Sequence, residues 1–297
     1  MLETEKNRKA RRLKTGAIFL VILLVIAELV ALVADAGEAG KPVQPSEAIQ
    51  RVKEEMRKEA AAENSNAEGK SKLLWNSWYT MTVGEKVPFG YYNDRVEKRD
   101  GKYAYQNQLW KMEEGFINEE RVVSFGKDDA NVSPILFNFL GTYRDSEFSI
   151  DGTFKGTKLS VKARRNKQNL PPIETNVPSK AFLSTLFQVW IGKHLPEAKP
   201  GKRLPFVTLF EDGLDTRYAS INGAMTLEAE DDYAKKTGTK KLSVELAGMK
   251  SVWYVLPTGE SVRIEKPDQH LVIEKKTEAE ARRFLVKRTE DLPKSGR

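Results

Sequence analysis

The sequence predicts a β-rich α+β protein: a curved antiparallel sheet, or half-barrel, with a buried helix on its concave face, preceded by a transmembrane helix and a juxtamembrane helix. Three features of the 297-residue chain carry this prediction. Stretches such as 159–164 and 242–246 alternate apolar and polar residues, which is typical of half-buried strands. Glycine-containing turn pairs separate such stretches, and one apolar run, 16–34, has the length of a bilayer-spanning helix.

Strands are expected throughout the region from residue 73 onward. Aromatic and branched residues concentrate in further runs, at 75–83, 103–110, 148–150, 252–256 and 271–273. Between the strands lie turn dipeptides whose glycines suit tight hairpins: Asp100-Gly101, Asp151-Gly152, Asn222-Gly223, Thr237-Gly238 and Thr258-Gly259. A parallel sheet would need a helix between successive strands, and the chain lacks room for them. The sheet is therefore expected to be mostly antiparallel.

Residues 16–34 read GAIFLVILLVIAELVALVA and contain a single charge, Glu28. They predict a transmembrane helix, or uncleaved signal anchor. Six Lys and Arg residues precede this run, whereas residues 36–70 carry six Lys and Arg against seven Asp and Glu. Because the basic side stays in the cytoplasm, everything after the run is expected on the other side of the membrane.

Glu28 leaves a second interpretation of this run open. An ionised carboxylate near the bilayer centre costs roughly 2.5 to 3.5 kcal/mol, which favours a cleaved signal peptide ending at the A-x-A pattern of 34–36. In a retained helix, Glu28 is a candidate contact to a partner helix, or a side chain that reaches the membrane interface.

Five regions are expected along the chain. They are a basic cytoplasmic tail at 1–15, the transmembrane helix at 16–36, a hinge, amphipathic helix and linker at 37–72, an extracytoplasmic domain at 73–285, and a C-terminal tail at 286–297. The third region opens with a Gly- and Pro-rich hinge and continues with apolar residues at helical spacing, which predict the juxtamembrane helix.

Residues 179–195 break the strand pattern. The segment SKAFLSTLFQVWIGKHL follows Pro178 and places apolar residues on nearly all sides of a helix, so it predicts a buried helix. Its aromatic residues, with those of the first strands, are expected to form core or, in the alternative, to enclose an apolar cavity for an acyl chain or similar ligand. The candidate cavity residues are Phe182, Leu183, Leu186, Phe187, Trp190, Trp78, Tyr103 and Tyr105.

Composition argues against several other functions. The chain has no cysteine, which excludes disulfides and thiol nucleophiles, and its two histidines, His194 and His270, lie in no catalytic motif. The prediction is a protein that is not an enzyme and needs no metal or cofactor. Of the net charge of +7, the first fifteen residues supply +4, from six basic and two acidic residues, so nucleic acid is not an expected partner. Acidic pairs such as Glu211-Asp212 are expected to be solvated caps.

The ends of the main domain resemble those of a known family. Trp78-Tyr79 leads into GEKVPFGYY at 84–92, and the chain later carries WYVLPTGESV at 253–262 and TEAEA at 277–281. These segments are similar to an uncharacterised bacterial envelope domain related to LolA/LppX-type half-barrels, of the kind sometimes fused to transglutaminase-like domains. The resemblance implies a hydrophobic ligand and a single-pass protein of the bacterial inner membrane with a periplasmic domain. The chain lacks the nucleophilic and acylated cysteines of some such proteins, and the transmembrane helix would replace the lipid anchor.

Two functions follow from these features. The first is a non-catalytic, membrane-anchored envelope protein that binds a lipid or other hydrophobic ligand. The second is an accessory or scaffold subunit of a membrane protein complex, with Glu28 and the juxtamembrane helix as partner contacts. The expected partners are therefore the membrane, through residues 16–34, a hydrophobic ligand and a membrane-complex subunit.

Overall fold

The computed structural model describes residues 71–84, 87–113, 116–143, 146–212 and 220–291. The chain divides into two compact units, 1–67 and 68–297, and all of these residues belong to the second. The segments expected before residue 71, with Glu28 and the apolar run 16–34, lie outside the described residues. Among the described helices, none is long and apolar enough to cross a bilayer.

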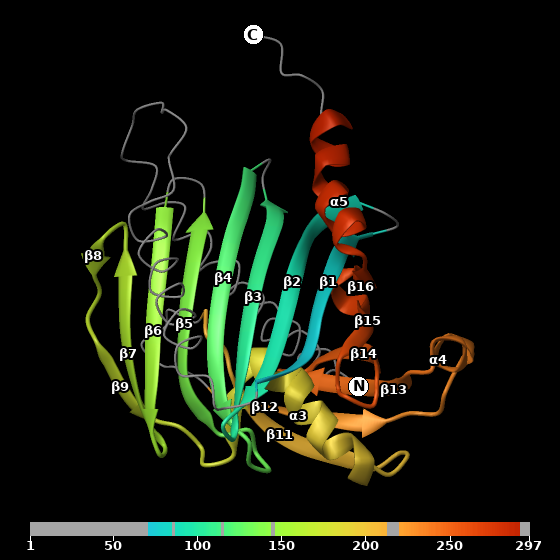
Figure 1. The fold of residues 1–297 in the computed structure, drawn as a ribbon, viewed down its shortest axis with the longest axis horizontal. Coiled ribbons are helices and arrows are strands. Elements are labelled where there is room, and N and C mark those ends of the chain that lie inside the picture. The colour runs from blue at the N-terminus through green and yellow to red at the C-terminus, as the bar shows by residue number, and fades with distance from the viewer. Residues whose placement is uncertain (1–70, 85–86, 114–115, 144–145, 213–219, 292–297) are drawn as a thin grey trace, which may run out of the picture. The chain divides into compact units, whose positions relative to one another are not determined.

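One large curved sheet of sixteen strands dominates the second unit (Figure 1). The described residues up to 176 supply β1 (Lys72–Val83), β2 (Val87–Arg99), β3 (Lys102–Glu113), β4 (Phe116–Lys127), β5 (Pro134–Tyr143), β6 (Ser146–Lys155), β7 (Lys158–Arg165), β8 (Gln168–Asn169) and β9 (Ile173–Asn176). The later residues supply β10 (Ala181–Leu183), β11 (Arg203–Leu209), β12 (Ser220–Leu227), β13 (Lys240–Leu246), β14 (Met249–Val255), β15 (Ser261–Lys266) and β16 (Leu271–Lys276). The strand-rich prediction is confirmed.

The sheet consists of two meanders joined by the first and last strands. Its order is β10-β11-β12-β13-β14-β15-β16-β1-β2-β3-β4-β5-β6-β7-β8, with β9 also on β7. In the join, Trp78 of β1 lies opposite Lys276 of β16, and Val83 lies opposite Leu271. The described strand pairs are antiparallel apart from the three-residue pair β10–β11. The antiparallel prediction is therefore confirmed.

Two of the five predicted turns are hairpin turns. Asp100-Gly101 joins β2 to β3 with φ of 49° and 69°, the doubly positive conformation of a type I′ turn. Thr258-Gly259 lies between β14 and β15, with a φ of 90° at the glycine. A third pair, Thr237-Gly238, instead ends the short helix α4 (Asp232–Thr237), where Gly238 takes the left-handed conformation.

The other two predicted turns are wrong, because their glycines lie inside strands. Gly152 of β6 pairs directly with Phe137, and Gly223 of β12 pairs directly with Phe206. A Cβ atom at Gly152 would lie 2.0 Å from the Phe137 ring, and one at Gly223 would lie 2.4 Å from the Phe206 ring. Each glycine therefore makes room for an aromatic ring on the neighbouring strand.

The predicted helix at 179–195 is helical only in its second part. The segment begins with β10, continues through the 3-10 turn η1 (Ser184–Leu186) and α3 (Phe187–His194), and ends in the 3-10 turn η2 (Leu195–Glu197). The first part is extended because β10 pairs in parallel with Val207–Leu209 of β11. Tertiary pairing here overrides the helical pattern.

The last described helix, α5 (Glu278–Asp291), follows β16 and packs on β1 and β2 (Figure 1). Its start is a capping box: the backbone N–H of Thr277 donates to Glu280 at 2.9 Å, and that of Glu280 donates to the Thr277 hydroxyl at 3.3 Å. Ala281 on its first turn is fully buried. The helix continues past residue 285, the predicted end of the domain.

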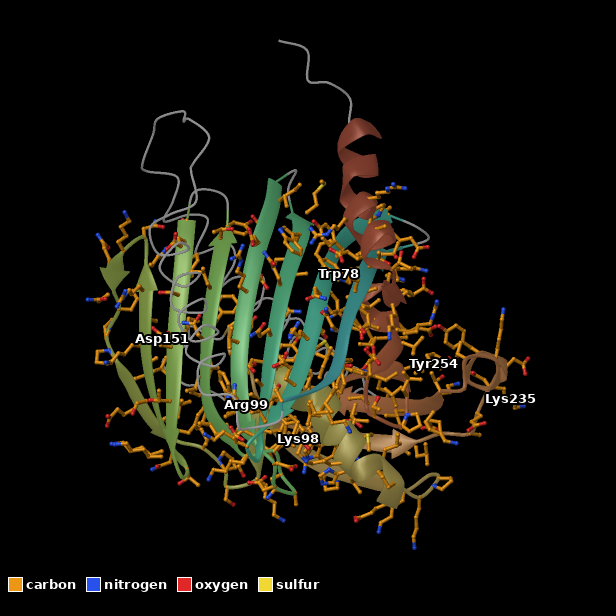
Figure 2. The ribbon with its side chains drawn as sticks, viewed as in Figure 1. Trp78, Lys98, Arg99, Asp151, Lys235 and Tyr254 are labelled. Carbon is orange, nitrogen blue, oxygen red and sulfur yellow. The ribbon has the colours of Figure 1, made fainter. Side chains whose placement is uncertain are left out.

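Alternate residues of β1 point to the two opposite faces of the sheet. Trp75 and Tyr79 are buried on the face that we call the inner face, where Trp75 belongs to one core cluster with Leu186 and Trp190 of the helical segment. Trp78 points to the opposite, outer face (Figure 2). There the Arg282 guanidinium of α5 lies over the Trp78 ring, 4.5 Å from the ring centre. Thus α3 and α5 pack on opposite faces.

Candidate functional site

A buried polar residue holds α3 to the inner face. The Gln188 side-chain amide donates to Oδ2 of Asp94 on β2 at 3.1 Å, and its oxygen accepts from the Ser261 backbone N–H on β15 at 2.7 Å. All three residues are at least nine-tenths buried. We call this set the Gln188 contact. It ties the helix to both meanders of the sheet.

Two glycines bring α3 into backbone contact with the β14–β15 turn. A Cβ atom at Gly259 would lie 2.0 Å from the Gln188 carbonyl oxygen, and one at Gly192 would lie 2.2 Å from the Thr258 carbonyl oxygen. Both distances are far below van der Waals contact, so only glycine fits at either position. The helix is therefore fixed in place on this side.

Asp94 is the charged member of the Gln188 contact. Its Oδ1 accepts from the Tyr105 hydroxyl and from the Asn107 side-chain amide, each at 2.6 Å. Burial raises the pKa of Asp94 to about 6, although these hydrogen bonds and the one from Gln188 favour the ionised form. Desolvation is the larger of the two opposing effects.

An apolar cavity of about 230 Å³ lies beside the helical segment formed by η1 and α3, next to Ser184 and Phe187 and away from the Gln188 contact. We call it the Phe187 cavity. Its walls come from the start of the helical segment, from β11, β13 and β14, and from the end of β15 and the turn after it. The lining residues are Ser184, Phe187, Phe206, Thr208, Phe210, Val244, Leu246, Met249, Lys250, Ser251, Trp253, Lys266, Asp268 and Gln269.

Strand alternation explains the β13–β14 wall. In that hairpin, Val244 pairs with Ser251 and Leu246 pairs with Met249, so the four side chains lie on one face. The Trp253 side chain follows on the same face, where its Nε1–H donates to the Ser251 hydroxyl at 2.9 Å. The hairpin thus presents a continuous apolar surface to the cavity.

Aromatic rings close the cavity toward the core. The Phe187 ring lies 4.8 Å from that of Phe206 and 5.2 Å from that of Trp253, edge on to the latter. Behind them, the Phe182 ring stacks on Phe187 at 5.9 Å and on Trp190 at 5.4 Å. Phe182 and Trp190 are buried, whereas Phe187 is half-buried beside the empty volume.

Lys266 brings a charge to this cavity. It is the last residue of β15 and is half-buried. Burial lowers the pKa of its ammonium group. Among the described residues, its ammonium has no hydrogen bond or ion pair.

Glu211 is buried and does not match the solvated cap expected for the Glu211-Asp212 pair. Its side chain is 3% exposed. The Ser184 hydroxyl donates to Oε2 of Glu211 at 2.6 Å. The Thr185 backbone N–H and the Ser124 hydroxyl donate to Oε1, at 3.2 Å and 3.3 Å. Burial raises the pKa of Glu211 despite these donors. The carboxylate anchors η1 at the start of the helical segment.

The eight predicted cavity residues occupy three different environments. Phe187 lines the cavity, and Phe182, Leu183, Leu186 and Trp190 are buried in the core around it.

The two tyrosines from the first strands belong to the same buried core cluster, where their hydroxyl groups donate to carboxylates, and Trp78 lies apart from it. The buried Tyr105 hydroxyl donates to Asp94. The Tyr103 hydroxyl donates to Oδ1 of Asp128 at 2.8 Å, and the Lys193 ammonium lies 2.6 Å from the same oxygen. Trp78 is on the outer face, so it lines no part of the cavity.

The two histidines hold ordinary structural positions. His194 Nδ1 lies 3.0 Å from the Trp190 carbonyl oxygen, and its ring stacks on that of Trp190 at 4.2 Å. His270 follows the turn η3 (Pro267–Gln269) in a left-handed conformation. Within the described ranges, no group of three or more His, Cys, Asp or Glu side chains is placed to hold a metal ion.

Comparison with known proteins gives one distant structural likeness. No protein-family model matches the sequence, and no curated protein matches it. A solved structure of a DUF1089 family protein from Pseudomonas aeruginosa, at 1.80 Å resolution, is similar with a TM-score of 0.36 and 12% sequence identity, over 79% of this chain and 96% of that chain. The relation to LolA/LppX-type half-barrels stays a prediction.

Proposed function

We propose that this chain is a non-catalytic envelope protein that binds a lipid or other hydrophobic ligand in the Phe187 cavity. In this proposal the curved sheet and α3 act as a half-barrel container, and residues 16–34 tether it to the bacterial inner membrane with the container in the periplasm. The observation that carries the proposal is an apolar space lined by Phe187, Phe206 and Trp253 and bordered by a helix that is fixed elsewhere.

The size of the cavity suits part of an apolar molecule. An engineered apolar cavity of about 150 Å³ stays dry and binds benzene, so 230 Å³ accommodates a small apolar group or a segment of an acyl chain. Ligand sites are generally concave and mostly apolar, with a few polar groups that fix orientation. Lys266 is such a group in this cavity.

The test is mass spectrometry of the organic extract of gently purified full-length protein. A molecule is expected in the extract at a fixed ratio to protein. Leu246→Trp fills the cavity, because Leu246 is a half-buried lining residue, and is expected to abolish the bound molecule. Ser243→Trp on the other face of the same strand is the matched control and should retain it. A wild-type protein with no extractable molecule, or equal amounts in all three proteins, would contradict the proposal.

A second candidate function, an accessory subunit of a membrane complex, is favoured by the outer face. There Trp78, Tyr91 and Trp110 form a half-exposed row, with Tyr91 and Trp110 stacked at 4.8 Å. Aromatic residues are common anchors of protein interfaces. Crosslinking of full-length protein in membranes should capture one partner in stoichiometric amount, and Trp110→Ala should reduce that capture. Unchanged capture would remove this candidate.

A further inference from the structure

We propose that the ligand of the Phe187 cavity is an anionic amphiphile, with its apolar chain against Phe187 and Trp253 and its carboxylate or phosphate group against the Lys266 ammonium. This inference rests on the proposed function and adds the charge of the ligand to it. Three observations support it: the position of Lys266, the partners of the other polar groups in the lining, and the charge balance at the cavity.

Lys266 lies on the inner face of its strand. It is two residues beyond Ile264, which is buried in a cluster with Tyr79, Met81 and Ile273, and alternate residues of a strand share a face. Neighbouring basic residues have carboxylate partners: Arg263 lies 2.6 Å from Glu265, and Lys275 pairs with Glu260. In the part of the chain that the structure describes, Lys266 has none.

The hydroxyl groups of the cavity already have partners within the protein. Ser184 donates to Glu211, Thr208 donates to the Phe182 carbonyl oxygen at 3.2 Å, and Ser251 donates to the Val244 carbonyl oxygen at 3.3 Å. Lys250 is exposed to water, so among the half-buried lining residues the Lys266 ammonium is the strong donor that is left for a ligand. Removing an ammonium from water without a partner is unfavourable, and burial lowers the pKa of this one, so a bound anion would compensate.

The remaining charges at the cavity cancel. Lys250 and Asp268 both line it and both are exposed. Their opposite charges leave Lys266 as the net positive charge next to the apolar surface. This balance favours a head group with negative charge over a neutral or cationic one.

The test is photoaffinity labelling of the full-length protein in nanodiscs of phosphatidylcholine. Three diazirine probes of equal chain length are compared: decanoic acid, decyl phosphate and 1-decanol. The readout is labelling of the tryptic peptide 251–263, which contains Ser251 and Trp253 and is unchanged by substitutions at residue 266. Both anionic probes are expected to label this peptide at least about fivefold more than the alcohol, since hydrogen bonds to charged groups are the stronger ones.

Substitutions then assign the preference to Lys266. Lys266→Met is expected to lower labelling by the anionic probes roughly tenfold, to the level of the alcohol, whereas Lys266→Arg keeps most of it. Lys162→Met, at an exposed position on β7, is the charge-matched control and should change nothing. The ratio of carboxylate to phosphate labelling identifies the kind of anion. Matching thermal midpoints for the Met and Arg variants show that both fold.

Two contrary results have different meanings. Equal labelling of the peptide by all three probes, unaffected by Lys266→Met, would overturn the anionic inference and leave the proposed function standing. No labelling of the peptide by any probe in the wild-type protein would overturn both.

Discussion

Two adjacent residues of α3, Phe187 and Gln188, face opposite environments. Gln188 is buried, with both ends of its side-chain amide hydrogen-bonded and its backbone in contact with Gly259. Phe187 is half-buried and borders an empty apolar volume. Protein interiors are close-packed and contain few voids larger than a water molecule. The contrast suggests that the cavity persists because the Gln188 contact prevents the helix from moving into it.

The largest expected effect is on the packed side of the helix. Gly259→Ala places a methyl group against backbone atoms of Gln188 and Gly192, at a φ of 90°. We expect a loss of at least about 4 kcal/mol in the free energy of unfolding, because backbone cannot rotate away. Gly248→Ala is the matched control: φ is 81° but nothing lies within 4 Å, so roughly 1 kcal/mol is expected. Similar losses in chemical denaturation would refute backbone contact as the cause.

Truncating two stacked phenylalanines compares the core with the cavity wall directly. Phe182 is fully buried, so Phe182→Ala is expected to cost about 3 to 5 kcal/mol of stability. Phe187→Ala removes a ring that already borders empty space, and about half that loss is expected. Denaturant titration of both variants measures the difference. Equal losses would mean that the space beside Phe187 is filled in solution.

The pH dependence of stability tests the buried charge of the Gln188 contact. The folded pKa of Asp94 is about 6, above the unfolded value of about 3.9, so stability contributed by its protonated form is lost as pH rises from about 4 to about 6. Asp94→Asn cannot ionise. Its free energy of unfolding relative to wild type is therefore expected to rise by roughly 2 to 3 kcal/mol between pH 4 and pH 7.

Asp128 supplies a control of opposite sign. Lys193 and Lys98 hold the pKa of its carboxyl group well below the usual range. Its contribution to stability is thus present above the unfolded pKa of about 3.9 and is lost as pH falls. Asp128→Asn should accordingly lose stability relative to wild type as pH rises from 2 to 5. Parallel pH profiles for wild type and Asp94→Asn would contradict the assignment for Asp94.

The smallest effect is expected at Lys266. In protein without ligand, Lys266→Met removes a half-buried ammonium that has no partner among the described residues, so stability should change by no more than about 1 kcal/mol, and upward. Lys275→Met should instead be destabilising, since it leaves the buried Glu260 without its ion pair. Thermal unfolding distinguishes the two. A clear loss for Lys266→Met would show that this lysine stabilises the fold.

The sequence predicted the sheet well because strand alternation is a local property. It failed where a residue's surroundings come from distant strands: Gly152 and Gly223 have the local composition of turns, yet each lies under a phenylalanine of a neighbouring strand. The extended start of the 179–195 segment has the same cause, since β10 pairs with β11.

The candidate site was predictable only in part, for the same reason. The apolar helix pointed to Phe187, but Asp94 and Lys266 are charged residues whose burial depends on β2 and β15 packing under other elements. Trp75 and Trp78 are three residues apart, so a strand must place them on opposite faces. Which one faces inward is decided by the helices on each side, and Trp78 faces α5.

Xenon binding in crystals of the full-length protein determines whether the Phe187 cavity is a dry apolar space, because xenon enters dry apolar cavities and not polar sites. We expect anomalous xenon density between Phe187, Phe206 and Trp253, and none at the Gln188 contact. Leu246→Trp is expected to abolish the density. Ordered water in place of xenon in the wild-type cavity, or side chains collapsed into it, would show that the Gln188 contact does not hold an apolar cavity open.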